Sequence, residues 1–401
     1  MNICCDESDQ QDKDEDGRTQ CDHPVPGCAH ESLRVGVDAH VLDGKYQGSR
    51  TWLIEVLRRA PRIAPDITFV IYSYDPERSA RLLEFAPVEH RKLPSVGPVS
   101  RNLIVWPRSV RRDRLALLIT QYYCSPGIAS TQIPVIHDVL PETHPRFFPW
   151  QRRWRNRLLL PWSARRSRIV ITVSEYSRKQ IAQLYHRSMA EIAIVSSGVD
   201  ASSFNSSEAP TTSVTGGLPY GLFVGRLEPR KNLTLALAAL RLLPEPAARL
   251  VVVGRNDFED PGVLMQLEAE PRAVHLADVP DDVLRALYRD AAVLIYPSLG
   301  EGFGLPILES LAAGTPVIAS DVTAIPETGG KSCHYFSPSA PDAADTVADL
   351  FALAVQGRLE FDAAEAASHV SSLSADRAAE QFVDAIRLAS TLGRGGRHSR
   401  R

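Results

Sequence analysis

Long apolar runs are missing from this sequence of 401 residues. No stretch reaches the roughly 18–20 apolar residues that a membrane-spanning helix needs. No apolar segment follows the acidic first residues, so we expect no secretory signal. A strong charge of one sign is also missing, since the formal net charge is -3. The composition therefore gives no reason to expect a nucleic-acid partner.

Cysteine is scarce and unevenly placed. Four of the six cysteines lie in a polar head that ends near Cys28, and the other two, Cys124 and Cys333, are far apart. A disulfide-stabilised domain would need a denser and more regular set. The distribution favours a reduced, cytoplasmic protein.

The polar head contains one candidate metal site. Cys21 and His23, followed by Cys28 and His30, are residue types that bind zinc. No apolar pattern surrounds them, which is typical of a segment without a packed core. We therefore favour a disordered acidic leader over residues 1–32.

From Leu33 on, short β-branched runs alternate with stretches of helical spacing. The predicted strands lie at residues 33–42, 67–74, 115–119, 133–139, 169–174, 220–227, 248–254, 292–298 and 315–321. The predicted helices lie at residues 51–60, 175–185, 232–243, 281–291 and 305–314, and the alanine-rich stretch at about 342–389 is also predicted to be helical. This alternation predicts an α/β protein whose parallel sheets are covered on both faces.

The alternation is interrupted once. Residues 201–217 are rich in Ser, Thr, Pro and Gly and have little to bury, so we interpret them as a linker. The chain is also longer than one core usually organises. Two αβ domains joined by this linker are expected, with ligands at the carboxyl ends of the strands.

The stretch EGFGLPILESLAAGTPVIASD follows a predicted strand directly. Its glycines allow backbone N–H groups to approach a ligand, and Pro306 suits the first turn of a helix. A helix N-terminus there would attract phosphate. Glu301 and Glu309 are bidentate acceptors that suit vicinal hydroxyls. The stretch therefore predicts a site for a phosphate held between two polyols, as in a nucleotide sugar.

A second charged turn supports this interpretation. GRLEPRKN carries Arg226 and Lys231 just after a predicted strand. Two cations on one turn can reach one diphosphate, whose developing charge in glycosyl transfer needs such donors. Either motif alone is common as a solvated turn, and their combination in this order carries the prediction.

Together these motifs resemble the family 4 retaining glycosyltransferases, also described as group 1, which have the GT-B fold. The E-x7-E pattern matches Glu301 and Glu309, and the basic pair matches Arg226 and Lys231. VSEYSR at 173–178 and IHD at 136–138 resemble first-domain motifs of the family. The resemblance spans roughly residues 33–389.

The resemblance implies the fold and the domain layout. GT-B enzymes consist of two Rossmann-like αβα domains that face each other across a cleft. We expect an acceptor domain at 33–200, a donor domain at 218–375, a last helix at 376–390 that returns to the first domain, and a disordered basic tail at 391–401.

The resemblance also implies the role of each site residue. Arg226 and Lys231 are expected to bind the diphosphate, and Glu309 the ribose. The donor sugar is expected to contact Glu301 and the backbone of Phe303, Gly304 and Leu305. The remaining implied contacts are Val279 near the base, His137 near the donor sugar and acceptor, and Gly48 near the phosphate.

Two departures from the family pattern affect the acceptor side. The first loop, DGKYQGSR, has two separated glycines, Gly44 and Gly48, where the family often has two or three together. SSGVD, with Ser196 and Ser197, stands where P-N-G-V-D is usual. His137 beside Asp138 also has a structural interpretation, as a hydrogen-bonded residue at a strand end.

We expect no cofactor and no metal. The Asp-x-Asp triplets at 12–14 and 14–16 follow no strand, so we interpret them as solvated charge rather than a divalent-ion site. The two site cations can supply the positive charge, as the resemblance implies. The expected reaction is retaining transfer by front-face attack, in which the departing phosphate takes the proton.

The donor and acceptor are predicted by similarity alone. IHDVLPETHPRFF looks closest to mannosyltransferase members, so GDP-mannose is the expected donor. A glycan or lipid-linked acceptor of polysaccharide biosynthesis is the expected acceptor. Two alternatives remain: a non-catalytic nucleotide-binding GT-B protein, and an NAD-dependent oxidoreductase, for which the G-x-G-x-x-G pattern is missing.

The arginine-rich stretch at 152–168 has two interpretations. It interleaves arginines with Trp154, Trp162 and leucines. It could be a basic surface helix that covers the first sheet, or it could rest on an anionic membrane surface. The second interpretation would place a cytoplasmic protein at the inner face of the membrane.

Overall fold

The structure is a computed structural model that describes residues 32–44, 47–128, 131–204, 212–245, 247–256 and 261–392. Residues from Leu33 on form one unit. The Cys/His set and the Asp-x-Asp triplets of the leader lie outside the described residues, as do the basic tail from residue 393 on and residues 205–211 of the linker.

The first domain is built on a parallel sheet. Within the described residues it has seven strands in the order β3-β2-β1-β4-β5-β6-β7. Their bounds are β1 Leu33–Asp38, β2 Ile67–Ser73, β3 Glu89–Lys92, β4 Leu117–Gln121, β5 Gln132–Val135, β6 Val170–Thr172 and β7 Ile192–Ile194. The order reverses between β1 and β4, so ligand groups are expected at the carboxyl ends of β1, β4 and β5.

The second domain repeats this plan. Within the described residues its six parallel strands have the order β10-β9-β8-β11-β12-β13. Their bounds are β8 Tyr220–Val224, β9 Arg249–Val253, β10 Ala273–Leu276, β11 Val293–Tyr296, β12 Val317–Ser320 and β13 Cys333–Phe336. Here the order reverses between β8 and β11, which carry the two charged motifs on neighbouring strand ends.

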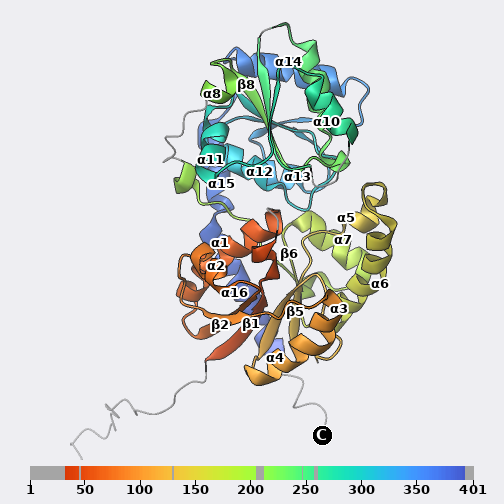
Figure 1. The fold of residues 1–401 in the computed structure, drawn as a ribbon, viewed down its shortest axis with the longest axis vertical. Coiled ribbons are helices and arrows are strands. Elements are labelled where there is room, and N and C mark those ends of the chain that lie inside the picture. Colours follow the sequence, from red (N-terminus) through yellow and green to blue (C-terminus); the bar gives the residue numbers. More distant parts are fainter. Residues whose placement is uncertain are drawn as a thin grey trace, which may run out of the picture. The chain divides into compact units, whose positions relative to one another are not determined.

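Helices cover both faces of each sheet (Figure 1). In the first domain they are α1 Gly48–Ile63, α2 Pro76–Leu82, α3 Pro98–Ser100, the π-helix η2 Arg101–Val105, α4 Trp106–Arg112, α5 Leu140–Thr143, α6 Trp150–Arg166 and α7 Glu175–Tyr185. After the linker segment, with η5 Ala201–Phe204 and α8 Thr212–Thr215, come α9 Leu233–Leu242, α10 Pro261–Glu268, α11 Asp281–Asp290, α12 Leu305–Ala312, α13 Ile325–Gly329, α14 Ala343–Val355, α15 Ala363–Ser372 and α16 Ala375–Leu392. Short 3-10 turns at His40–Asp43, Pro145–Phe147, Met189–Glu191 and Pro229–Lys231 complete the described elements.

Each strand sends alternate side chains to opposite cores, as its period of two requires. In the second sheet Phe223 and Ile295 face a core formed with α9 and α14. Leu222 and Leu294 face the other way, toward α11 and α12. Both faces are apolar, which is why these strands read as continuous hydrophobic runs.

The last helix packs on the first domain, although it follows the second in sequence. Phe382 of α16 lies edge-on to Trp52 of α1, with ring centroids 5.9 Å apart, and stacks on Phe69 of β2 at 6.3 Å. Gln381 accepts a hydrogen bond from the N–H of Ser196. This helix therefore completes the core of the first domain, and it extends through Thr391 and Leu392, where a disordered tail was predicted.

One predicted strand boundary was wrong, and three strands were missed. The first strand ends at Asp38, and His40–Asp43 forms a 3-10 turn where the strand was expected to continue. The edge strands β3, β10 and β13 were not predicted. Strand β3 has the sequence EHRK, without an apolar residue.

Candidate active site

The two charged motifs meet at one edge of the second sheet. The segment after β8 carries Arg226 and Lys231, and the segment after β11 carries Glu301. Strands β8 and β11 are parallel neighbours, with Leu222 opposite Leu294. Their carboxyl ends therefore lie side by side, where ligands bind in such sheets.

Glu301 is the centre of a buried charged network. Lys231 Nζ donates to its Oε1 over 2.7 Å, Arg230 lies 2.7 Å from its Oε2, and the Ser298 hydroxyl donates over 2.6 Å. Lys231 also donates to the Tyr296 hydroxyl over 3.0 Å. Charge-assisted bonds of this kind fix the carboxylate in place.

The charges of this network are set by its burial and its pairing. Burial alone would raise the pKa of Glu301, but Arg230 and Lys231 outweigh it and hold this pKa well below its usual range. Burial lowers the pKa of Lys231, although Glu301 opposes the shift. Glu301 is therefore ionised at neutral pH.

Sequence reasoning missed Arg230. Its guanidinium is buried between Glu228 and Glu301 and also donates to the carbonyl of Gly300. These partners come from two segments, so no local pattern separates Arg230 from Arg226 in the sequence. Arg230 acts as the fixed cation that holds Glu301.

Arg226 is placed differently. Its side chain is 34% exposed, against 12% for Lys231, and its guanidinium lies 3.6 Å from a carboxylate oxygen of Glu228. Its charge also acts on the hydroxyl of Tyr122, which follows β4 in the first domain. Arg226 is therefore the more exposed of the two predicted cations, and Lys231 is the one paired with Glu301.

The glycine loop after Glu301 is shaped by close contacts. A Cβ at Gly302 would lie 2.9 Å from both the Asp138 Cβ and the carbonyl oxygen of His137. Gly304 has a φ of 110°, in the region that favours glycine, and precedes Leu305, the first residue of α12. Phe303 is buried against the core. The loop thus places the N-terminus of α12 at the carboxyl end of β11, the same sheet edge as Glu301 and Lys231.

Glu309 lies apart from Glu301, one helical turn into α12. Its Oε2 accepts a hydrogen bond of 2.6 Å from the Tyr288 hydroxyl of α11. Burial raises the pKa of Glu309 to about 7, with smaller contributions from the carboxylates of Asp281 and Glu55, and the Tyr288 bond offsets part of the shift. Val279 precedes α11 and packs against the same core.

The segment of the first domain that follows β6 contacts the second domain through hydrogen bonds. The Ser174 hydroxyl, after β6, donates to the carbonyl of Gly302 over 2.7 Å. The Glu327 carboxylate of α13 accepts from the N–H groups of Glu175 and Tyr176 over 2.6 and 3.0 Å. It thereby caps the N-terminus of α7 from the other domain.

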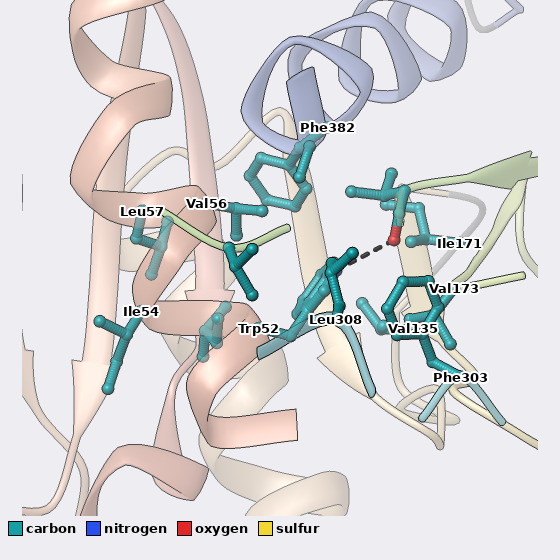
Figure 2. Packing of buried hydrophobic residues seen from close by; sticks show 14 of the residues in the cluster. Trp52, Ile54, Val56, Leu57, Val135, Ile171, Val173, Phe303, Leu308 and Phe382 are labelled. Atoms are coloured by element: carbon teal, nitrogen blue, oxygen red, sulfur yellow. Dashed lines mark hydrogen bonds between the residues drawn. The ribbon is translucent and has the colours of Figure 1, made fainter. Parts of the chain in front are cut away.

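Apolar side chains join the domains beside these polar contacts. Figure 2 shows Phe303 and Leu308 of the second domain near Trp52, Val135 and Val173 of the first. One continuous core therefore includes the walls of the candidate site.

His137 is buried at the carboxyl end of β5. Its ring lies 5.2 Å from Trp52, edge-on, and 5.8 Å from Tyr122. Burial lowers its pKa to about 4, so the imidazole is neutral at pH 7. Within the described residues its Nε2 has no hydrogen-bond partner.

The predicted site residues are thus brought together only in part. Lys231, Glu301 and the Gly302–Leu305 loop share one sheet edge, and His137 contacts that loop through its carbonyl. Glu309 and Val279 lie nearer α11. Gly48 is the first residue of α1, and no described atom lies within 4 Å of a Cβ built there.

The structure also places a residue that the sequence did not single out. Tyr122 has a left-handed backbone with a φ of 63°, unusual for a bulky side chain. It directly follows β4, and its ring centroid lies 5.8 Å from that of His137. No composition signal marks it.

Two further features bear on chemistry. Among the described residues no group of three His, Cys, Asp or Glu side chains is arranged to hold a metal ion. No helix in the described part of the chain is long and apolar enough to cross a bilayer.

Comparison with known proteins follows the same division into two halves. Residues 46–203 match a model described as Glycosyltransferase Family 4, and residues 219–352 match one described as Glycosyl transferases group 1. Similar chains are the O-antigen chain mannosyltransferase B of Escherichia coli, 34% identical over 53% of this chain, and the O-antigen chain mannosyltransferase RfbU of Salmonella typhimurium, 29% identical over 55%. The matches span 58% and 61% of those two proteins.

The fold also has solved neighbours. HepE of Anabaena, in a structure with UDP and glucose, has a TM-score of 0.68 at 17% identity, covering 88% of this chain and 99% of HepE. Its likeness concerns the fold alone. Two Rossmann-like domains on parallel sheets, with both family models matched in order, are the GT-B architecture, and the chain belongs to the family 4, group 1 glycosyltransferases.

Proposed function

We propose that this protein transfers mannose from GDP-mannose, with retention of the anomeric configuration, to a glycan or lipid-linked acceptor. The observation that carries the proposal is the network of Glu301, Lys231 and Arg230 at the joined ends of β8 and β11. A departing nucleoside diphosphate needs fixed cations and N–H donors at such a position. The mannosyltransferase names of two relatives support mannose as the sugar.

The proposed roles follow the position of each group. Lys231 and Arg226 bind the diphosphate together with the N-terminus of α12. Glu309 accepts hydrogen bonds from the ribose, beside Val279 at the base. The sugar contacts Glu301, the backbone of Phe303, Gly304 and Leu305, and His137. Gly48, at the start of α1, lets the backbone approach the phosphate from the first domain.

The electrostatics support front-face attack. Glu301 is neutralised by two cations, which makes it a weak nucleophile and a good orienting acceptor. The acceptor hydroxyl attacks the anomeric carbon on the face that the diphosphate leaves. Its proton passes to the departing phosphate oxygen, so the bond formed and the bond broken share one face. Arg226 and Lys231 supply the positive charge, and we propose that no metal is required.

Turnover of a donor panel tests this proposal. The protein is incubated with GDP-mannose, UDP-glucose, ADP-glucose and NAD, with and without a chelator, and the anomeric proton of the product is observed by NMR. Release of GDP with retained configuration is expected, and Lys231→Ala lowers the rate about a hundredfold or more. A folded protein that binds nucleotide but releases no sugar from any donor would favour the non-catalytic alternative.

We also propose that the protein works in the cytoplasm, at the inner face of the membrane, where a lipid-linked acceptor would be presented. The arginine-rich stretch at 152–168 supports this location, because it forms helix α6 with exposed tryptophans.

A further inference from the structure

Helix α6 has one face that is buried against the first domain and one face that is exposed. Asn156, Leu160, Ser163 and Ala164 are buried against the first domain. The other face exposes large apolar side chains one turn apart: Trp150 at 64%, Trp154 at 58%, Leu158 at 65% and Trp162 at 36%. We call these four residues the α6 stripe. A basic helix that only covered the sheet would keep its large apolar side chains inside.

The charge around the stripe has one sign. Between Glu142 and Glu175 the chain has eight arginines and not one aspartate or glutamate. Arg157, Arg165 and Arg166 line a shallow hollow with Leu158, Pro161 and Trp162. The Arg166 guanidinium lies over the Trp162 ring, 5.8 Å from its centroid. Tryptophan and arginine together are the composition of helices that lie in the headgroup region of a membrane.

We infer that the α6 stripe docks on an anionic lipid bilayer, with its tryptophans in the interface and its arginines on the headgroup phosphates. A second copy of this chain is a poorer occupant, because a symmetric contact would bring two sets of arginines together. The inference does not rest on the proposed donor or reaction.

The first domain has a second group of exposed apolar side chains. Val99 of α3 is 70% exposed, and Leu103 and Ile104 of η2 are 53% and 45% exposed. The loop after β4 links this group to the buried face of α6, since the N–H of Cys124 bonds to Ser163 and the Ser125 hydroxyl bonds to the carbonyl of Asn102.

The start of α6 is tied to the acceptor side of the site. Arg155 Nε donates to the Tyr123 hydroxyl over 3.1 Å, and that hydroxyl donates to Asn156. Tyr123 follows Tyr122 at the end of β4, and the charge of Arg152 acts on Tyr122 and Asp138. A bilayer under the stripe would therefore present a lipid-linked hydroxyl beside the first-domain strand ends.

Co-sedimentation of the full chain with vesicles tests the inference without any turnover. The vesicles contain phosphatidylcholine alone or an equal mixture with phosphatidylglycerol, at low and at physiological salt. Wild type is expected to bind the anionic vesicles at least tenfold more tightly, with blue-shifted tryptophan fluorescence and weaker binding at high salt. The variant W154S/L158S is expected to lose about a hundredfold in affinity, and R157Q/R166Q about tenfold.

Matched variants separate docking from other effects. Trp154→Phe keeps an apolar ring and is expected to retain binding. L242S/R358Q changes an exposed leucine and an exposed arginine of the second domain and is expected to bind like wild type. Donor turnover in W154S/L158S is expected to equal that of wild type, so a failed docking proposal and a failed transferase proposal give different results.

Three results would overturn the inference. The first is that the wild-type protein does not bind anionic vesicles. The second is equal vesicle binding by wild type and W154S/L158S. The third is a dimer in solution that becomes a monomer in W154S/L158S, which would assign the stripe to a second copy of the chain.

Discussion

Arg230 is the site residue whose role becomes visible only in the folded structure. It pairs with Glu228 and Glu301, which come from segments after different strands. The E-x7-E pattern and the position of Lys231 were readable from the sequence because each is a local motif. The pairing of Arg230 with Glu301 was not readable, because a neighbouring arginine on the same turn, Arg226, looks equivalent until both side chains are placed.

Arg230→Met removes one cation from two buried carboxylates. Because Glu228 and Glu301 would lose their shared partner, we expect a loss of about 3–5 kcal/mol in the free energy of unfolding. Urea denaturation measures it, with Arg230→Lys as the variant that keeps the charge and loses less. A free energy within about 0.5 kcal/mol of wild type would contradict the network as described.

Glu309 is expected to make stability depend on pH. Its pKa is raised from 4.5 to about 7 by burial, so between these values the folded protein keeps a proton that the unfolded chain releases. The free energy of unfolding therefore falls as the pH rises from 4.5 to 7. The Glu309→Gln side chain does not titrate, so this variant is expected to lose the dependence of the free energy of unfolding on pH in that range.

Unfolding of both proteins at several values from pH 4.5 to pH 8 checks the prediction. Glu365→Gln, at an exposed carboxylate on α15, is the control and keeps the wild-type slope. Parallel curves for wild type and Glu309→Gln would show that burial does not set the titration of Glu309. In its proposed role, Glu309 accepts hydrogen bonds from both ribose hydroxyls only when it is ionised. The affinity of wild type for the nucleotide is therefore expected to rise as the pH increases through 7, whereas that of Glu309→Gln is not.

At the scale of the elements, the alternation of strands and helices predicted the sheets but not their edges. Strands β3 and β13 are hydrogen-bonded on one side only, and so is β10. An edge strand tolerates polar side chains, as EHRK in β3 shows. The hydrophobic pattern that revealed the central strands is therefore weak at the edges.

The loop before α12 is held by contact with the first domain. Gly302→Ala would bring a Cβ to 2.9 Å from Asp138 and from the His137 carbonyl, so we expect a loss of about 1–3 kcal/mol in the free energy of unfolding. Gly48→Ala is the matched control, because a Cβ there meets no described atom within 4 Å. Equal effects of the two changes in thermal unfolding would rule out the close approach of Gly302.

At the scale of the whole molecule, the end of the chain returns to the first domain. Phe382 of α16 contacts Trp52 and Phe69, so Phe382→Ala is expected to cost about 3–5 kcal/mol of the free energy of unfolding. Leu388→Ala, at a side chain 39% exposed on the same helix, is expected to cost far less. Chemical denaturation compares the two, and similar losses would argue against α16 as part of this core.

The central claim is that the joined ends of β8 and β11 bind a nucleoside diphosphate. Titration calorimetry of wild type and Lys231→Ala with GDP and UDP tests it most directly. The account predicts that wild type binds GDP and that Lys231→Ala binds it about a hundredfold more weakly while remaining folded. Wild type that binds neither nucleotide, or a Lys231→Ala variant that binds GDP as tightly as wild type does, would contradict it.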